Sequence, residues 1–181
     1  LMNKLKNFSN VKVFMGFDPG TKGFVSMIAE DGTFIKAEPI FRDIKVVDMI
    51  ETANRLLAFV EGYEVRHVVI EDVHALYGSS AKGTFTFGYN SCVPEFFCAI
   101  AGLPYTKIPP KKWQSDMHKG IKLITKNDGI KTVKDNKKMS IVAAHRIFPD
   151  VSLKRSSRSL KDDDNFADSL LMAEYGRRHF K

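Results

Sequence analysis

VKVFMGFDPG, at residues 11–20, is the stretch that decides the fold. An almost unbroken apolar run that ends at a Pro-Gly turn is typical of a strand buried on both faces. We therefore expect residues 11–18 to form a central strand with Asp18 at its carboxyl end. The polar, basic residues 1–10 are expected to be a flexible segment, which leaves 11–181 as a single domain.

Outward from this strand, the pattern alternates between strands and helices. The expected elements are a hairpin at 23–28 and 33–37, a helix at 46–60, a parallel strand at 65–73, helices at 94–101, 137–148 and 162–178, and a strand at 103–109. This order predicts an α/β fold with a mixed sheet. The helix at 94–101 is apolar on every side, so it belongs in the core or in a dimer interface.

Three segments show weaker signals. Residues 78–90, GSSAKGTFTFGYN, are rich in Gly, Ser and Thr and are expected to form a mobile surface loop. In it Phe85, Phe87 and Tyr89 alternate, which favours a small hairpin packed on the core. The polar stretch 111–136 gives no clear periodicity, and 151–161 is expected to be a basic linker.

Composition restricts the class of protein. No stretch approaches the roughly 20 apolar residues that span a bilayer, so we expect no membrane association. The two cysteines, Cys92 and Cys98, make neither a disulfide framework nor a zinc motif, which indicates a reducing intracellular setting.

The net charge of +7 is regional. Residues 105–161 carry 15 Lys and Arg against 4 Asp and Glu, whereas the remaining chain carries 13 basic and 17 acidic residues. A solvated lysine-rich face is one interpretation of such a run. A surface that binds a polyanion is the interpretation that we favour, because one-sided positive charge is typical of phosphate recognition.

Acidic residues occur at the ends of both long apolar strands. If these strands are parallel neighbours, Asp18 and Glu71 converge about 5 Å apart, at the edge where α/β sheets place ligands. Taken singly, each acid is equally well explained as a turn residue.

The last helix adds two more carboxylates. Asp162 and Asp163 suit its N-terminus as capping and dipole-complementing residues. Asp164 and Asp168 instead share a stripe with Leu171, Met172 and Tyr175, which should pack on the sheet. Carboxylates gathered there would repel one another without a cation. We therefore expect Mg²⁺, two ions per site, in phosphodiester hydrolysis with water as the nucleophile.

Five blocks of the sequence resemble the RuvC-type Holliday junction resolvases, especially phage-encoded ones. They are GFDPGTKG (16–23), VVIEDVHA (68–75), LPYTKIPPKKW (103–113), KKMSIVAAHRIFPD (137–150) and DDDNFADSLLMAEYG (162–176). The resemblance implies a ribonuclease H-like fold, with a mixed five-stranded sheet flanked by helices, and a homodimer. It also implies Mg²⁺ or Mn²⁺, paired nicks in four-way and other branched DNA, and the cytoplasm of a bacterium or phage-infected host cell.

By this resemblance Asp18, Glu71 and Asp168 match three catalytic metal ligands. The fourth acid departs from the bacterial pattern, which has it three residues before the last aspartate, where Asn165 stands here. Asp164, four residues before, is the residue that we expect to replace it, with Asn165 as a neutral alternative.

The resemblance also assigns residues to DNA. His74, with Tyr77 as a near substitute, matches an aromatic wedge at the crossover, although an ordinary loop residue is an equal alternative. The lysines that match positions near the scissile phosphate are Lys111, Lys112, Lys137 and Lys138.

Two other functions are compatible with the sequence. The Asp18-Pro19-Gly20-Thr21 turn also resembles the phosphate-binding turn of actin-like sugar and acetate kinases, although those proteins need two such domains. A junction-binding protein without catalysis is the non-enzymatic alternative, which Asn165 motivates.

Overall fold

The structure, a computed structural model, describes residues 11–43, 47–74, 78, 80–127 and 129–180. The segment 1–10, expected to be flexible, lies outside the described residues, so its boundary stays a prediction. The main sheet has the order β3-β2-β1-β4-β5. Its strands are β1 (Lys12–Asp18), β2 (Phe24–Ala29), β3 (Phe34–Pro39), β4 (Glu64–Glu71) and β5 (Tyr105–Ile108). The mixed five-stranded sheet with β1 at its centre was therefore predicted correctly.

Side chains of β1 alternate between two separate apolar cores. Val13, Met15 and Phe17 join the cluster that includes α1 (Met49–Val60) and α3 (Val93–Ala101). Phe14 faces the opposite way and joins the cluster around α6 (Asp164–His179). Because both faces are covered, nearly every position of the strand is apolar, which is why the run at 11–18 is readable in the sequence.

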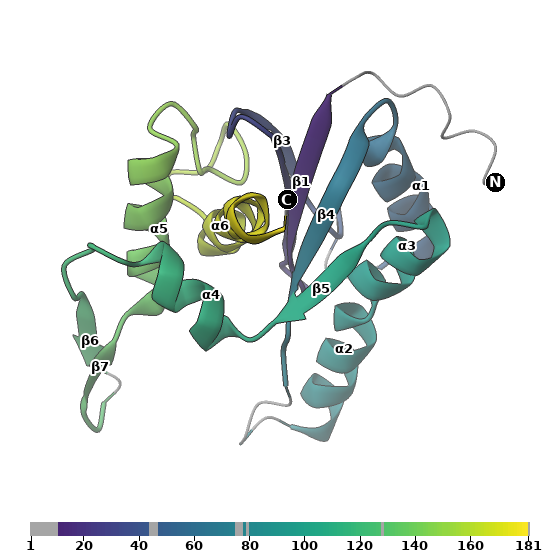
Figure 1. Cartoon of the computed structure of the whole chain (residues 1–181). Coiled ribbons are helices and arrows are strands. Elements are labelled where there is room, and N and C mark those ends of the chain that lie inside the picture. The colour runs from purple at the N-terminus through teal and green to yellow at the C-terminus, as the bar shows by residue number, and fades with distance from the viewer. Residues whose placement is uncertain (1–10, 44–46, 75–77, 79, 128, 181) are drawn as a thin grey trace.

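Helices form a layer on each side of the sheet (Figure 1). On one side α6 lies across β1 and β2, with α4 (Pro110–Met117) and α5 (Asn136–Ile147) packed against it. On the other side lie α1 and α3. Among the described residues, no helix is long and apolar enough to cross a membrane.

Burial of α6 exceeds what an amphipathic stripe predicts. Every residue from Phe166 to Gly176 except Asp168 is buried, because the helix contacts the sheet on one side and α4 and α5 on the other. The stripe of Asp164, Asp168 and three apolar residues is thus only part of a buried helix. Its N-terminus is capped by Asp163, whose side chain accepts hydrogen bonds from the backbone of Asn165 and Phe166, as predicted.

The prediction of a mobile loop with a hairpin at 78–90 was wrong. This region contains α2 (Ala81–Ser91), whose N-cap Ser80 accepts a hydrogen bond from the backbone of Gly83. Phe85 and Tyr89 therefore lie one turn apart on an exposed side of a helix and do not form a strand. Phe87 is half-buried.

The segment 111–136, for which no structure was predicted, is ordered into short elements. It contains α4 and an antiparallel two-stranded sheet of β6 (Thr125–Asn127) and β7 (Thr132–Lys134). Three-residue strands are too short to show periodicity in a sequence.

Candidate active site

Two acidic side chains meet where β1 and β4 end. The strands are parallel, with Phe17 opposite Ile70. Asp18 and Glu71 are the next residues on each strand, so they leave the carboxyl edge of the sheet side by side. This is the convergence that the sequence predicted on the condition that the strands were parallel neighbours.

The N-terminal half of α6 reaches the same edge because Gly16 permits a very close approach. A Cβ at Gly16 would lie 2.1 Å from the carbonyl oxygen of Ser169 and 2.4 Å from the backbone nitrogen of Ala173. The Oγ atoms of Ser26 and Ser169 also form a hydrogen bond of 2.6 Å between β2 and α6. With α6 fixed at this distance, Asp168 faces the strand ends.

The acids act on one another electrostatically. Asp18 is only 8% exposed, and burial raises its pKa well above the ordinary value, with further increases from Asp168, Glu71 and Asp164. Burial likewise raises the pKa of Asp168 to about 8, although a hydrogen bond from Ser140 opposes the rise, and Glu71 and Asp164 add to it. The four carboxyl groups thus form one electrostatic unit.

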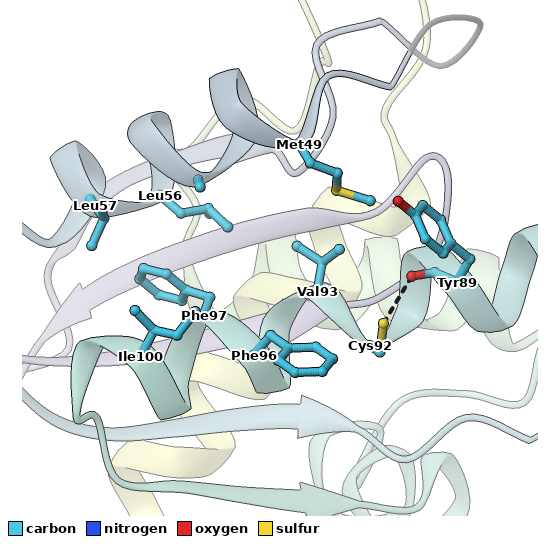
Figure 2. A pocket seen from close by; sticks show the side chains of 10 residues that line it. Met49, Leu56, Leu57, Tyr89, Cys92, Val93, Phe96, Phe97 and Ile100 are labelled. Carbon is cyan, nitrogen blue, oxygen red and sulfur yellow. Dashed lines mark hydrogen bonds between the residues drawn. The ribbon is translucent and has the colours of Figure 1, made fainter.

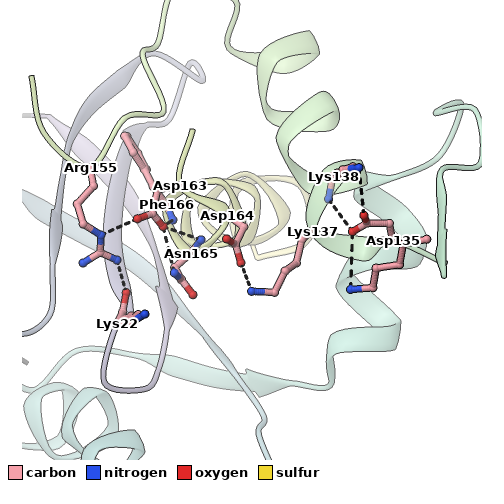
Figure 3. A network of polar contacts seen from close by, with 10 residues as sticks. Lys22, Asp135, Lys137, Lys138, Arg155, Asp163, Asp164, Asn165 and Phe166 are labelled. Carbon is pink, nitrogen blue, oxygen red and sulfur yellow. Dashed lines mark hydrogen bonds and ion pairs between the residues drawn. The ribbon is translucent and has the colours of Figure 1, made fainter. Parts of the chain in front are cut away.

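The acids differ in whether they have a partner. Asp164 pairs with Lys137 of α5 at 2.5 Å (Figure 3). Burial raises the pKa of Glu71, and a hydrogen bond from Trp113 opposes this rise. Oδ1 of Asp168 is buried and has no partner among the described residues.

The donor set suits a hard divalent cation, since Mg²⁺ prefers carboxylate oxygens. The unpartnered Oδ1 of Asp168 is a buried oxygen that such an ion would satisfy. Within the described ranges, however, no three His, Cys, Asp or Glu side chains are already arranged to hold a metal ion. The site therefore has the chemistry of a metal site, without a preformed coordination shell.

The position of Asn165 bears on the fourth acid. Its Nδ2 donates to Oδ1 of the capping residue Asp163 at 3.1 Å, so the amide is engaged by the helix cap (Figure 3). Asp164, in contrast, raises the pKa of both Asp18 and Asp168. Asn165 also lines the groove beside Asp18 and Glu71, so the choice of Asp164 over Asn165 as the fourth metal ligand stays a prediction.

A groove of about 480 Å³ lies over the acids, and Asp18, Glu71, His74, Phe87 and Asn165 are among its lining residues. The side chain of His74 is 79% exposed, with Nε2 3.8 Å from a carboxylate oxygen of Asp72. The alternative wedge residue Tyr77 lies outside the described residues. Helix α2, which the sequence did not predict, supplies one wall through Phe87.

The four candidate lysines are not gathered at one point. Lys137 alone among them contacts a described acid of the cluster. Lys138 turns to Asp135, with Nζ 3.8 Å from Oδ2 (Figure 3). Lys111 and Lys112 line two other hollows on either side of α4.

Three residues that support the acids were not identified from the sequence. Nε1 of the fully buried Trp113 donates to Oε1 of Glu71 at 3.0 Å. Behind Asp168, the Oγ of Ser140 is 3.0 Å from Nε2 of His118, and both residues are buried. The only sequence signal is that Trp113 is the single tryptophan of the chain.

Arg155, in the predicted linker, also has a structural role. Its Nε donates to Oδ2 of Asp163 at 2.5 Å, and its second guanidinium nitrogen donates to the carbonyl of Lys22 at 2.6 Å (Figure 3). It therefore ties the N-terminus of α6 to the turn that follows β1.

Comparison with known proteins shows the fold. No protein-family model and no curated protein sequence matches the chain. The solved structure of Thermus thermophilus RuvC in complex with a Holliday junction substrate aligns with a TM-score of 0.60 at 15% identity, over 92% of this chain and 95% of that chain. A second Thermus thermophilus RuvC structure aligns with a TM-score of 0.57 at 15% identity and the same coverage. The chain thus has the RuvC-like, ribonuclease H-like fold, and assignment to a phage branch stays a prediction.

Proposed function

We propose that this protein is a magnesium-dependent endonuclease that resolves four-way DNA junctions and cuts related branched DNA. The observation that carries the proposal is the convergence of Asp18, Glu71, Asp164 and Asp168 at one edge of the sheet, where desolvation raises the pKa values of Asp18 and Asp168. Such a set of carboxylates is stabilised best by a divalent cation.

These four acids would hold two Mg²⁺ ions, with Mn²⁺ as a substitute. When bound, Mg²⁺ lowers the pKa of a coordinated water and stabilises negative charge on a phosphate. The chain itself orients the ligands: Trp113 holds Glu71, and Ser140 supports Asp168. Lys137, beside Asp164, offers a cation where a phosphate would enter.

DNA binding is supported by a set of lysines without acidic partners. Lys111, Lys112, Lys119, Lys122 and Lys134 form no ion pair with any carboxylate that the structure describes. Lysines without acidic partners are suited to binding phosphates. Because the RuvC structure of the same fold carries a Holliday junction substrate, a four-way junction is the substrate that we infer, and the exposed His74 is the wedge candidate. The protein would act in the cytoplasm of a bacterium or of a phage-infected cell.

Symmetric cleavage of a junction calls for a dimer, since two related cuts need two sites on a two-fold axis. An apolar surface suited to this lies on α1, α2 and α3 (Figure 2). Phe96 is 64% and Ile100 67% exposed, beside a hollow of about 320 Å³ whose lining includes Leu57 and Tyr89. We propose this surface as the homodimer interface.

The decisive experiment incubates the protein with an end-labelled four-way junction and Mg²⁺, with duplex, flap and RNA–DNA hybrid as controls. Paired nicks at symmetric positions are expected. A junction that is shifted in a gel but stays intact would favour the second candidate function, a junction-binding protein without catalysis. The observation that keeps this candidate is Asn165, a neutral residue that lines the groove beside Asp18 and Glu71.

A further inference from the structure

A second cleft lies beside the acidic groove. It is enclosed by α4, the segment that follows it, β7 and the start of α5, and has a volume of about 700 Å³. Pro110 lines both this cleft and the acidic groove, so the two are neighbours on the surface. Of its lining residues, the family resemblance assigns a role only to Lys111, and none of the four acids lines it.

Two buried polar atoms in the walls of this cleft lack partners. His118 is 5% exposed, and its Nε2 is engaged by Ser140, but its Nδ1 has no hydrogen-bond partner among the described residues. The Oδ1 atom of Asn136 is also buried and has no hydrogen-bond partner among the described residues. Both residues line the cleft. Buried polar groups without partners are rare, and a ligand that supplies the missing hydrogen bonds is one explanation.

The interior of the cleft is neutral. Burial, and then the nearby cations Lys134 and Arg146, lower the pKa of His118 to about 4. The imidazole is therefore uncharged at pH 7, with one N–H donor and one acceptor nitrogen. A neutral imidazole and a carboxamide match the hydrogen-bonding edge of a nucleobase better than they match an anion.

The remaining walls divide into an apolar part and a cationic part. Leu123, which is 64% exposed, and the buried Met139 offer apolar surface, against which the face of a base can lie. Lys111 and Lys134 add two exposed cations at the same cleft. A phosphate ion alone would contact only the lysines. A nucleotide would contact the lysines, the apolar side chains and the neutral polar groups of His118 and Asn136.

We propose that this cleft binds one unpaired nucleotide of the substrate strand, with its base against Leu123, His118 and Asn136 and its phosphate at Lys111 and Lys134. The inference rests on the proposed function, since a strand that crosses the acidic groove passes Pro110 to reach the cleft. It adds a base-recognition site next to the cleavage site, and hence a determinant of where a junction is cut.

The test compares two probes of equal length and charge: a ten-residue thymidine oligonucleotide and a ten-residue tract of abasic deoxyribose phosphate. Fluorescence anisotropy on the whole protein is expected to show roughly tenfold tighter binding of the thymidine probe, the scale of a lost base contact. The variants Asn136→Ala and Leu123→Ser should each reduce this preference. Lys119→Ala, a matched change on a surface outside the cleft, should weaken binding of both probes alike.

A direct readout is the ¹⁵N resonance of His118 Nδ1. It should shift with the thymidine probe and stay unchanged with the abasic tract or inorganic phosphate. Equal binding of both probes by the unmodified protein, or a preference that both cleft variants keep, would overturn the proposal. If the protein cleaves junctions but shows no preference for the thymidine probe, only the proposal of a nucleotide-binding cleft is rejected. If it prefers the thymidine probe but never cleaves a junction, only the proposed nuclease function is rejected.

Discussion

Trp113 and Glu71 are joined by a hydrogen bond of 3.0 Å from the indole Nε1 to the carboxylate Oε1. The bond links α4 to the end of β4, and the tryptophan is fully buried. An indole has one donor and no acceptor, so this contact fixes one oxygen of the acid and leaves the other available. A buried aromatic residue thus orients a candidate metal ligand.

Replacing Trp113 with Phe should weaken Mn²⁺ binding by roughly 10–100-fold, the effect typical of a lost partner to a metal ligand. Titration calorimetry without DNA measures this directly. Met117→Leu, a conservative change in the same core cluster, is the control for general loss of packing. Unchanged Mn²⁺ affinity in the Phe variant would show that Glu71 needs no such orientation.

Asp18→Asn and Asp168→Asn should each abolish junction cleavage while junction binding is retained, because phosphate contacts dominate affinity. Cleavage and gel-shift assays at one salt concentration give both quantities. The exposed Asp150 provides a control, since Asp150→Asn should leave both unchanged. If both site variants still cleave, the acids are not the metal site.

The metal-free protein should become less stable as the pH rises. The pKa of Asp168 is about 8 in the folded protein and 3.8 as its ordinary value, so the folded state holds this proton more strongly. The contribution of Asp168 to the free energy of unfolding is therefore fully present below about pH 4 and is lost as the pH rises toward 8. Urea denaturation at several pH values should show a decrease of about 2 kcal/mol or more.

Asp168→Asn should flatten that pH dependence and raise the stability at pH 8, because the costly carboxylate is gone. Saturating Mg²⁺ should have a similar effect on the unmodified protein, since a bound cation stabilises the charged form. Equal pH slopes for the variant and the unmodified protein would assign the effect to another group.

Gly16→Ala should prevent stable folding or cost more than about 3 kcal/mol, since overlap with the backbone of α6 cannot be relieved by a rotamer change. The control is Gly88→Ala in α2, where nothing lies within 4 Å of the added Cβ and helix propensity improves by about 1 kcal/mol. Thermal unfolding of both variants checks the contrast. A stable Gly16→Ala protein would mean that α6 can move away from β1.

Phe96→Asp and Ile100→Asp should convert the proposed dimer to a monomer at little cost in folding, because both side chains are exposed in the single chain. Analytical ultracentrifugation gives the mass. Leu160→Asp, at a side chain that is 94% exposed and distant from α3 in the sequence, should leave the mass unchanged. A dimer that persists in both α3 variants places the interface elsewhere.

The sequence predicted well the features whose cause is local. The strand around Met15 was readable because burial on both faces leaves an apolar run, and the capping role of Asp163 follows from residue chemistry alone. The sequence did not predict helix α2, because Gly83, Gly88 and the threonines lower the helix propensity of this segment. There the cap at Ser80 and packing against α3 outweigh weak intrinsic propensity.

The sequence by itself therefore determined the central strand, the five strands of the main sheet, and the positions of Asp18 and Glu71 at strand ends and of Asp168 on the last helix. Only the tertiary structure decided that Trp113 supports Glu71 across 42 positions of the chain, that His118 stands behind Ser140, and that Lys137 faces Asp164. Periodicity records which face of an element is buried. It does not record which distant side chain will be there, because that depends on how the whole chain packs.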